Sequence, residues 1–144
     1  MKTKKKVKLF LVDDDKVFLK ALEIEFSQGN DFEIKTYATG ELCIEDLSEN
    51  PDIIILDYHL DDIERDAMNG IQTLDKIKET NNEISVIMLS SQDKIDIAIN
   101  CMHHKALDYV VKSETSFVRL QKIITDIFHS KKIEKQLSWY VERM

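Results

Sequence analysis

Two runs of apolar residues end in acidic side chains, and these acids are the residues best placed to do chemistry. Residues 53–56 are wholly apolar and precede Asp57, and residues 7–12 lead into Asp13 and Asp14. If both runs are buried strands of one parallel sheet, the three carboxylates meet at one edge of it. Such carboxylates repel one another by roughly 4 kcal/mol per pair at 4 Å and an effective dielectric of 20. The sequence therefore predicts a cation, and Mg²⁺ suits hard oxygen ligands with positions left for water and phosphate.

Two further strand ends bring a hydroxyl and an ammonium group toward the same edge. Ser90 follows the apolar run 84–89, and Lys112 follows the run 107–111. Once cations neutralise the surroundings, a carboxylate oxygen can attack an activated phosphorus atom in line while cations hold the equatorial oxygens. We predict Asp57 as this nucleophile, because it lies alone at the centre of the sheet, with the acids of the N-terminal run holding the metal directly or through water.

Strand-length apolar runs alternate with stretches of helical periodicity, the pattern of repeated βα units around a parallel sheet. The predicted strands are residues 7–12, 32–37, 53–56, 84–89 and 107–111. The run 32–37 alternates between apolar and polar residues, which is typical of a half-exposed edge strand. Each helix is predicted to have one apolar face, and these faces contain Phe18, Leu22 and Phe26; Leu42, Ile44 and Leu47; Ile71, Leu74 and Ile77; Ile95, Ala98 and Met102; and Phe117, Leu120, Ile124, Ile127 and Phe128.

Right-handed crossovers between these elements favour an α/β fold of the flavodoxin-like (βα)5 type, a three-layer sandwich with parallel sheet order 2-1-3-4-5. In that order the first and third strands are neighbours where the winding reverses, and ligands bind at their carboxyl ends. We expect one domain over residues 1–130 and an extended C-terminal helix or linker over residues 131–144. Two interpretations of the extension stay open: a helix folded back on the body, or a dimerising or linker helix leading to an output module.

Composition and charge exclude several classes of protein. The chain is 43% hydrophobic, and its apolar runs are far shorter than the ~20 residues that span a bilayer, so we expect no membrane segment. The net charge is −7, and basic residues are spread along the chain except at the N-terminus, which argues against direct nucleic-acid binding. Cys43 and Cys101 have no metal-ligand spacing, so we expect buried thiols and a cytoplasmic protein.

Four motifs in this order resemble the receiver domains of two-component response regulators, of the CheY-like type, over essentially residues 6–128. They are FLVDDD at 10–15, PDIIILD at 51–57, VIMLSS at 86–91 and DYVVK at 108–112. The resemblance implies a phosphorylation-dependent signalling switch, which is not an enzyme beyond its own phosphotransfer and dephosphorylation. Asp57 would accept a phosphoryl group from the phosphohistidine of a histidine kinase or histidine phosphotransfer protein.

The resemblance also implies a metal site. Asp14 and Asp57 would supply carboxylates to Mg²⁺, Asp13 would help through water, and the backbone carbonyl of His59 would complete the set. The residues two positions beyond the acceptor and the switch hydroxyl are His59 and Gln92. We expect both to border the path of the attacking water and to tune the lifetime of the phosphoryl group.

The switch residues follow from the same resemblance. Ser90 resembles the hydroxyl that moves to bond the phosphoryl group, with Lys112 as ion-pair partner, and Tyr109 resembles the aromatic residue that turns inward. A partner would sense the surface formed by the fourth helix, fifth strand and fifth helix, and a homodimer through that surface or through the C-terminal helix is compatible with the resemblance. The plainer interpretation of Tyr109, an edge-strand aromatic, stays open.

The sequence departs from the family pattern at two places. The loop after the acceptor contains no proline and carries an acidic insertion over residues 61–68 before Asn69 and Gly70. Lys112 is followed by Ser113, where the family usually has a proline in the cis form. Both departures lie next to the predicted site, and they bear on local geometry and on the fit of a kinase.

Plainer roles compete for some of these residues. Asp15 is expected to cap a helix rather than to bind metal. His103 and His104 are expected to form a polar helix end, because adjacent helical residues point about 100° apart and no third ligand is evident.

Two other functions compete with the receiver. A haloacid-dehalogenase-type phosphatase would also have a strand followed by D-x-D-x-T/V, as residues 9–17 do, but it needs an acidic strand after the lysine, and only a helix is predicted after Lys112. A pseudo-receiver that only binds proteins is the other alternative.

Overall fold

The computed structural model describes residues 6–61 and 65–143, and within them the core is a five-stranded parallel sheet in the order β2-β1-β3-β4-β5. The strands are β1 (Val7–Val12), β2 (Phe32–Tyr37), β3 (Ile53–Asp57), β4 (Ser85–Ser90) and β5 (Asp108–Val111). The helices are α1 (Lys16–Phe26), α2 (Gly40–Glu45), the short 3-10 turn η1 (Leu47–Glu49), α3 (Gly70–Thr80), α4 (Ile95–His103) and α5 (Ser116–Arg143). The predicted flavodoxin-like sheet order is confirmed.

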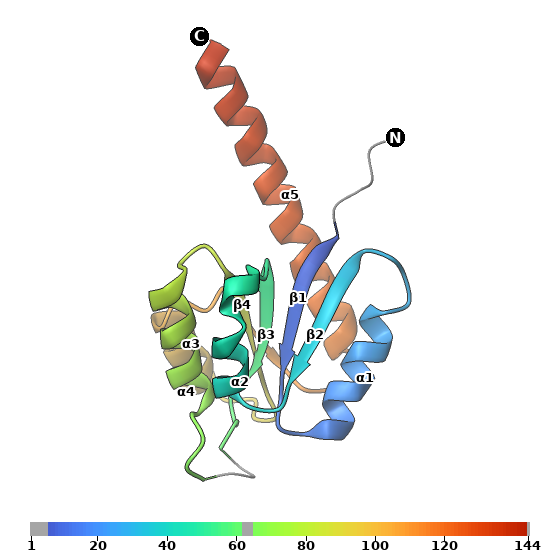
Figure 1. The fold of residues 1–144 in the computed structure, drawn as a ribbon, viewed down its shortest axis with the longest axis vertical. Coiled ribbons are helices and arrows are strands. Elements are labelled where there is room, and N and C mark those ends of the chain that lie inside the picture. The colour runs from blue at the N-terminus through green and yellow to red at the C-terminus, as the bar shows by residue number, and fades with distance from the viewer. Residues whose placement is uncertain (1–5, 62–64, 144) are drawn as a thin grey trace. The chain divides into compact units, whose positions relative to one another are not determined.

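Helices α2, α3 and α4 pack on one face of the sheet (Figure 1). One continuous core cluster joins side chains of α2, α3 and α4 to alternate residues of the central strands: Phe10, Val12, Ile54, Leu56, Val86 and Met88. Residues of α1 are absent from that cluster among the described residues, and α1 contacts β1 and β2. Strand β3 is buried throughout, whereas β2 is largely exposed at the edge, as its alternating sequence predicts.

The prediction of which residues of the fourth helix face the core is wrong. Ile95 is 78% exposed and Met102 is 49% exposed, while Cys101 is fully buried against the core. Ile99, 52% exposed, lies on the same outward side. Helix α4 carries apolar residues around most of its circumference, so periodicity alone could not select the side that faces the sheet.

The second helix also differs from its prediction, because α2 ends at Glu45 and Leu42 is 46% exposed. The buried residues of this segment are Cys43 in α2 and Leu47 in η1. Cys43 and Cys101 are both free, buried thiols, as predicted.

The chain divides into two compact units, Met1–Lys112 and Ser113–Met144. The second unit contains α5, which runs as one helix to Arg143, so the predicted extended C-terminal helix is confirmed. The boundary at residue 130 stays a prediction. Among the described residues, no helix combines the length and the apolar character needed to cross a bilayer.

Candidate functional site

Adjacent strands bring the predicted acids together at the carboxyl edge of the sheet. Val12 pairs with Leu56 across β1 and β3, so the residues that follow them, Asp13 and Asp57, lie side by side. Both are almost completely buried, at 1% and 3% exposure. With Asp14 they offer three carboxylate oxygens that all lie within 4.8 Å of one another.

Lys112 reaches into this acidic cluster from the end of β5. Its Nζ lies 2.8 Å from Oδ2 of Asp13 and 3.5 Å from Oδ1 of Asp57. Its backbone N–H donates to the carbonyl of Ser90 at 2.7 Å, which fixes the start of its side chain beside β4. The lysine thus approaches both acids although Ser113 stands where the family usually has proline. The N–H of Ser113, which a proline would lack, donates to Oγ of Ser116 at 2.6 Å.

Burial and neighbouring charges perturb the ionisation of Asp57 and of Lys112. Burial, followed by the negative charge of Asp13, raises the pKa of Asp57 to about 7, against the opposing effects of Lys112 and of the His59 N–H. Burial alone would lower the pKa of Lys112, but its hydrogen bond to Asp13 and the charges of both acids outweigh burial and raise it. The site therefore holds a charged lysine between two acids, one of which resists ionisation.

Backbone contacts at Gln92 connect the two predicted switch residues. Ser90 is fully buried at the end of β4, and its Oγ accepts a hydrogen bond from the Gln92 N–H at 3.1 Å. The hydroxyl of Tyr109 donates to the carbonyl of the same Gln92. The tyrosine ring is thereby held toward the loop that follows β4.

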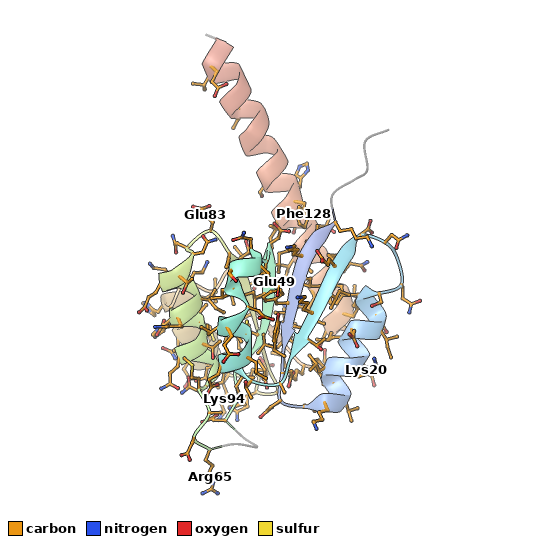
Figure 2. All side chains as sticks on the ribbon, viewed as in Figure 1. Lys20, Glu49, Arg65, Glu83, Lys94 and Phe128 are labelled. Atoms are coloured by element: carbon orange, nitrogen blue, oxygen red, sulfur yellow. The ribbon has the colours of Figure 1, made fainter. Side chains whose placement is uncertain are left out.

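The loop between β3 and α3 is closed at its base. The Gly70 N–H donates to the Tyr58 carbonyl at 3.1 Å, and the His59 N–H donates to Oδ1 of Asp57 at 3.3 Å. In this loop the Arg65 side chain points away from the sheet (Figure 2). The insertion thus leaves the backbone beside Asp57 tied to the start of α3.

A family model for the response regulator receiver domain matches residues 9–125. The chain belongs to this family. Curated relatives include the protein-glutamate methylesterase/protein-glutamine glutaminase of Bacillus licheniformis, 36% identical over 112 residues, which are 74% of this chain and 29% of the relative. The regulatory protein LuxO of Vibrio cholerae is 29% identical over 100 residues, which are 69% of this chain and 21% of LuxO. The receiver domain thus spans only about a fifth to a third of these relatives.

Solved receiver structures are similar in fold and in sequence. The BeF3-activated DrrB receiver domain has a TM-score of 0.70 and 29% identity, covering 84% of this chain and 99% of that chain. A chain of the CheX-CheY-BeF3-Mg complex from Borrelia burgdorferi has a TM-score of 0.71 and 27% identity, covering 84% and 89%. Membership of the receiver family argues against the phosphatase alternative.

Receiver domains generally accept phosphoryl groups, interact with histidine kinases or phosphotransfer proteins, and typically bind Mg²⁺ at an acidic cluster. The donors in this receiver domain fit that ion, because they are clustered carboxylate oxygens, the hard ligands that Mg²⁺ prefers. Asp13 and Asp57 are buried, so their mutual repulsion is weakly screened by water and favours a bound cation.

The structure adds two residues near the site to which the sequence assigned no role there. The sequence places Phe18 on the apolar face of a helix, and in the structure its ring lies under Lys112, with Nζ 4.6 Å from the ring centroid. Gly70 packs so tightly that an added Cβ would lie 2.5 Å from the Asp57 carbonyl oxygen. The signal for Gly70 was its place directly after Asn69, which caps α3. Phe18 had no comparable signal.

Other predicted polar residues take the plainer roles. Asp15 caps α1 by accepting hydrogen bonds from the N–H groups of Val17 and Phe18, as predicted. Helix α4 ends at His103, and Nδ1 of His104 lies 2.7 Å from Oδ1 of Asp75 in α3, within hydrogen-bond distance. Within the described ranges, the only cluster of three candidate metal ligands is the acidic one at the strand ends.

Proposed function

We propose that this receiver domain accepts a phosphoryl group on Asp57 from the phosphohistidine of a sensor kinase or phosphotransfer protein. One observation carries the proposal: the buried Asp57 lies 3.5 Å from Lys112, and Asp13 and Asp14 each have a carboxylate oxygen close enough to bind the same metal ion. Asp13, Asp14, Asp57 and the backbone carbonyl of His59 would hold Mg²⁺. The ion would neutralise the carboxylates and bind phosphoryl oxygens.

The residues of the site suit this transfer. An oxygen of ionised Asp57 attacks phosphorus, an O–P bond forms, and the N–P bond of phosphohistidine breaks with its electron pair on the imidazole. Lys112 is placed to bind an equatorial phosphoryl oxygen with its ammonium group. Because burial and Asp13 disfavour the ionised form of Asp57, positive charge from Lys112 and the metal is what makes the nucleophile available near neutral pH.

We propose that the Gln92 backbone couples Ser90 to Tyr109. Movement of Ser90 toward a phosphoryl oxygen would strain or break its 3.1 Å hydrogen bond with the Gln92 N–H. The Gln92 carbonyl, which holds the Tyr109 hydroxyl, would shift with it. The change would reach the surface of α4 and β5. A Tyr109→Phe variant should be phosphorylated normally but show smaller amide shifts in α4 on phosphorylation; equal shifts would refute the coupling.

His59 and Gln92 are proposed to tune the lifetime of the phosphoryl group. The His59 backbone is bound to Asp57 and the Gln92 backbone to Ser90, so both side chains begin beside the reacting groups. Alanine at both positions should change the rate of phosphate release after removal of the phosphodonor. An unchanged rate would exclude this role.

We propose the outward face of α4 as the surface that a partner binds. Ile95, Ile99 and Met102 are spaced by three and four residues and are all largely exposed. We propose a second copy of the chain as the partner, through this face or through residues 131–144, where Leu137 and Val141 are 59% and 69% exposed. Sedimentation with and without BeF3⁻ and Mg²⁺ should show a shift toward dimer, and Ile99→Asp should abolish a shift that uses the α4 face.

Incubation of the chain with Mg²⁺ and acetyl phosphate, followed by intact mass measurement, tests the function. The expected product carries one phosphoryl group, and Asp57→Asn abolishes it. Asp15→Asn is the matched control, because it makes the same chemical change in a neighbouring acid and keeps a good helix cap. Sustained turnover of phosphate esters that depends on Asp13 would instead indicate a phosphatase. Neither product nor turnover would indicate a pseudo-receiver.

A further inference from the structure

Phe18 lies in the site without a role in the function proposed above. It belongs to the first turn of α1, where its N–H is held by the Asp15 side chain at 3.2 Å. Its ring is half-buried, and the Lys112 ammonium lies over it, 4.6 Å from the centroid. This distance is within the range at which the negative face of an aromatic ring attracts a cation.

The neighbours of Lys112 differ in whether their attraction for its ammonium group persists during the reaction. Its ammonium contacts Asp13 at 2.8 Å and Asp57 at 3.5 Å, and its side chain is only 16% exposed. Under the proposed function, both of those carboxylates also interact with the metal, and Asp57 takes the phosphoryl group. Their attraction for the ammonium therefore changes as the reaction proceeds. The ring of Phe18 is uncharged and takes no part in the transfer, so its attraction for Lys112 is retained.

A lysine otherwise has little to orient it. Its four-carbon side chain has many rotamers, and fixing them costs conformational entropy. Phe18 limits that freedom from the side of α1, while the backbone of Lys112 is bound to Ser90. The anchored start of the side chain and the ring beneath its end together keep the ammonium beside Asp13 and Asp57.

We propose that Phe18 is a positioning residue for Lys112, and that the face of its ring keeps the ammonium where it binds a phosphoryl oxygen on Asp57. This inference rests on the proposed function. A purely structural role for Phe18 would require only an apolar side chain of similar size. The two roles differ in whether the effect of the ring passes through Lys112.

The experiment measures binding of BeF3⁻, a phosphoryl mimic, by ¹⁹F NMR at saturating Mg²⁺. Phe18→Leu, which keeps an apolar side chain without a ring, should weaken BeF3⁻ binding by about three- to tenfold. Phe18→Tyr, which keeps the ring, should bind within twofold of the original chain. Mg²⁺ affinity without BeF3⁻ should stay unchanged in both variants. Phe18→Met provides a second ring-free side chain should Phe18→Leu fail to fold.

Two controls separate positioning from packing. Phe26→Leu makes the same substitution on the same helix, at a ring that packs on Phe32 with centroids 5.4 Å apart, and should leave BeF3⁻ binding unchanged. In a Lys112→Gln background, Phe18→Leu should have no further effect on binding. If Phe18→Leu weakens BeF3⁻ binding equally in the Lys112→Gln background, or does not weaken it in the original chain, the positioning role of Phe18 is wrong. The proposed function would be unaffected by either result. Failure of the original chain to bind BeF3⁻ would overturn the proposed function itself.

Discussion

The buried carboxyl group of Asp57 predicts that, without metal, the folded chain loses stability as pH rises from about 4 to about 7. The pKa of Asp57 is about 7 in the folded chain, against 3.8 for an ordinary aspartate. Below pH 4 both folded and unfolded states hold the proton. Between these pH values Asp57 is protonated in the folded state and ionised in the unfolded state. Each further rise in pH therefore favours the unfolded state and lowers the free energy of unfolding. Above pH 7 the penalty is constant.

The size of the effect follows from the two pKa values. Integrating the difference in bound protons between pH 5 and pH 8 gives a loss of up to about 3 kcal/mol in the free energy of unfolding. Water entry and side-chain relaxation around the ionised carboxylate reduce this penalty, so the measured loss is expected between about 1 and 3 kcal/mol. Even the lower value is a large fraction of the stability of a small domain.

Urea unfolding in the presence of a chelator measures this loss. Other acids titrate over the same range, so the quantity of interest is the difference between the original chain and Asp57→Asn, which cannot ionise. The variant should gain about 1 to 3 kcal/mol relative to the original chain between pH 5 and pH 8. At pH 8, Mg²⁺ at 100 times its dissociation constant should restore about 2.7 kcal/mol to the original chain. A difference that is independent of pH, or that shrinks as pH rises, would refute the reasoning.

Two backbone positions give further predictions. Gly70→Ala would place a Cβ 2.5 Å from the Asp57 carbonyl oxygen, so we expect about 2 kcal/mol of destabilisation in urea and slower phosphorylation; Gly29→Ala, whose nearest contact would be 3.8 Å away, should do neither. Lys105→Gly should raise the free energy of unfolding by about 1 kcal/mol, because Lys105 has a left-handed φ of 74° that glycine adopts freely. Asn50→Gly, at φ 59°, should gain less, and an equal gain would contradict this account.

The sheet and the acidic cluster were predictable because both follow from simple rules. A wholly apolar run such as residues 53–56 fits a strand buried on both faces, and it is buried throughout. Right-handed crossovers place helices on both faces of such a sheet, and the flavodoxin-like strand order brings Asp13 beside Asp57. The site is predictable to the extent that it lies at strand ends.

Contacts that depend on tertiary packing were not predictable. The outward orientation of Ile95 and Met102 depends on which part of α4 fits the core beside α3. Six of the nine residues of α4 are apolar, and they cover more than half of its circumference, so the periodicity leaves open which part of this wide apolar face is buried. The hydrogen-bond contact between His104 and Asp75 joins residues far apart in the chain. The position of the Phe18 ring beneath Lys112 likewise depends on how α1 packs. The periodicity of the α1 sequence identifies Phe18 only as an apolar residue.

The central claim is that the carboxylate of Asp57 is the phosphoryl acceptor. Borohydride reduces an aspartyl phosphate to homoserine, so treatment of the chain after incubation with Mg²⁺ and acetyl phosphate, followed by peptide mapping, identifies the modified residue directly. The account predicts homoserine at position 57 and aspartate at positions 13 and 14. Homoserine at either of those positions, or an unmodified position 57 in a phosphorylated chain, would contradict it.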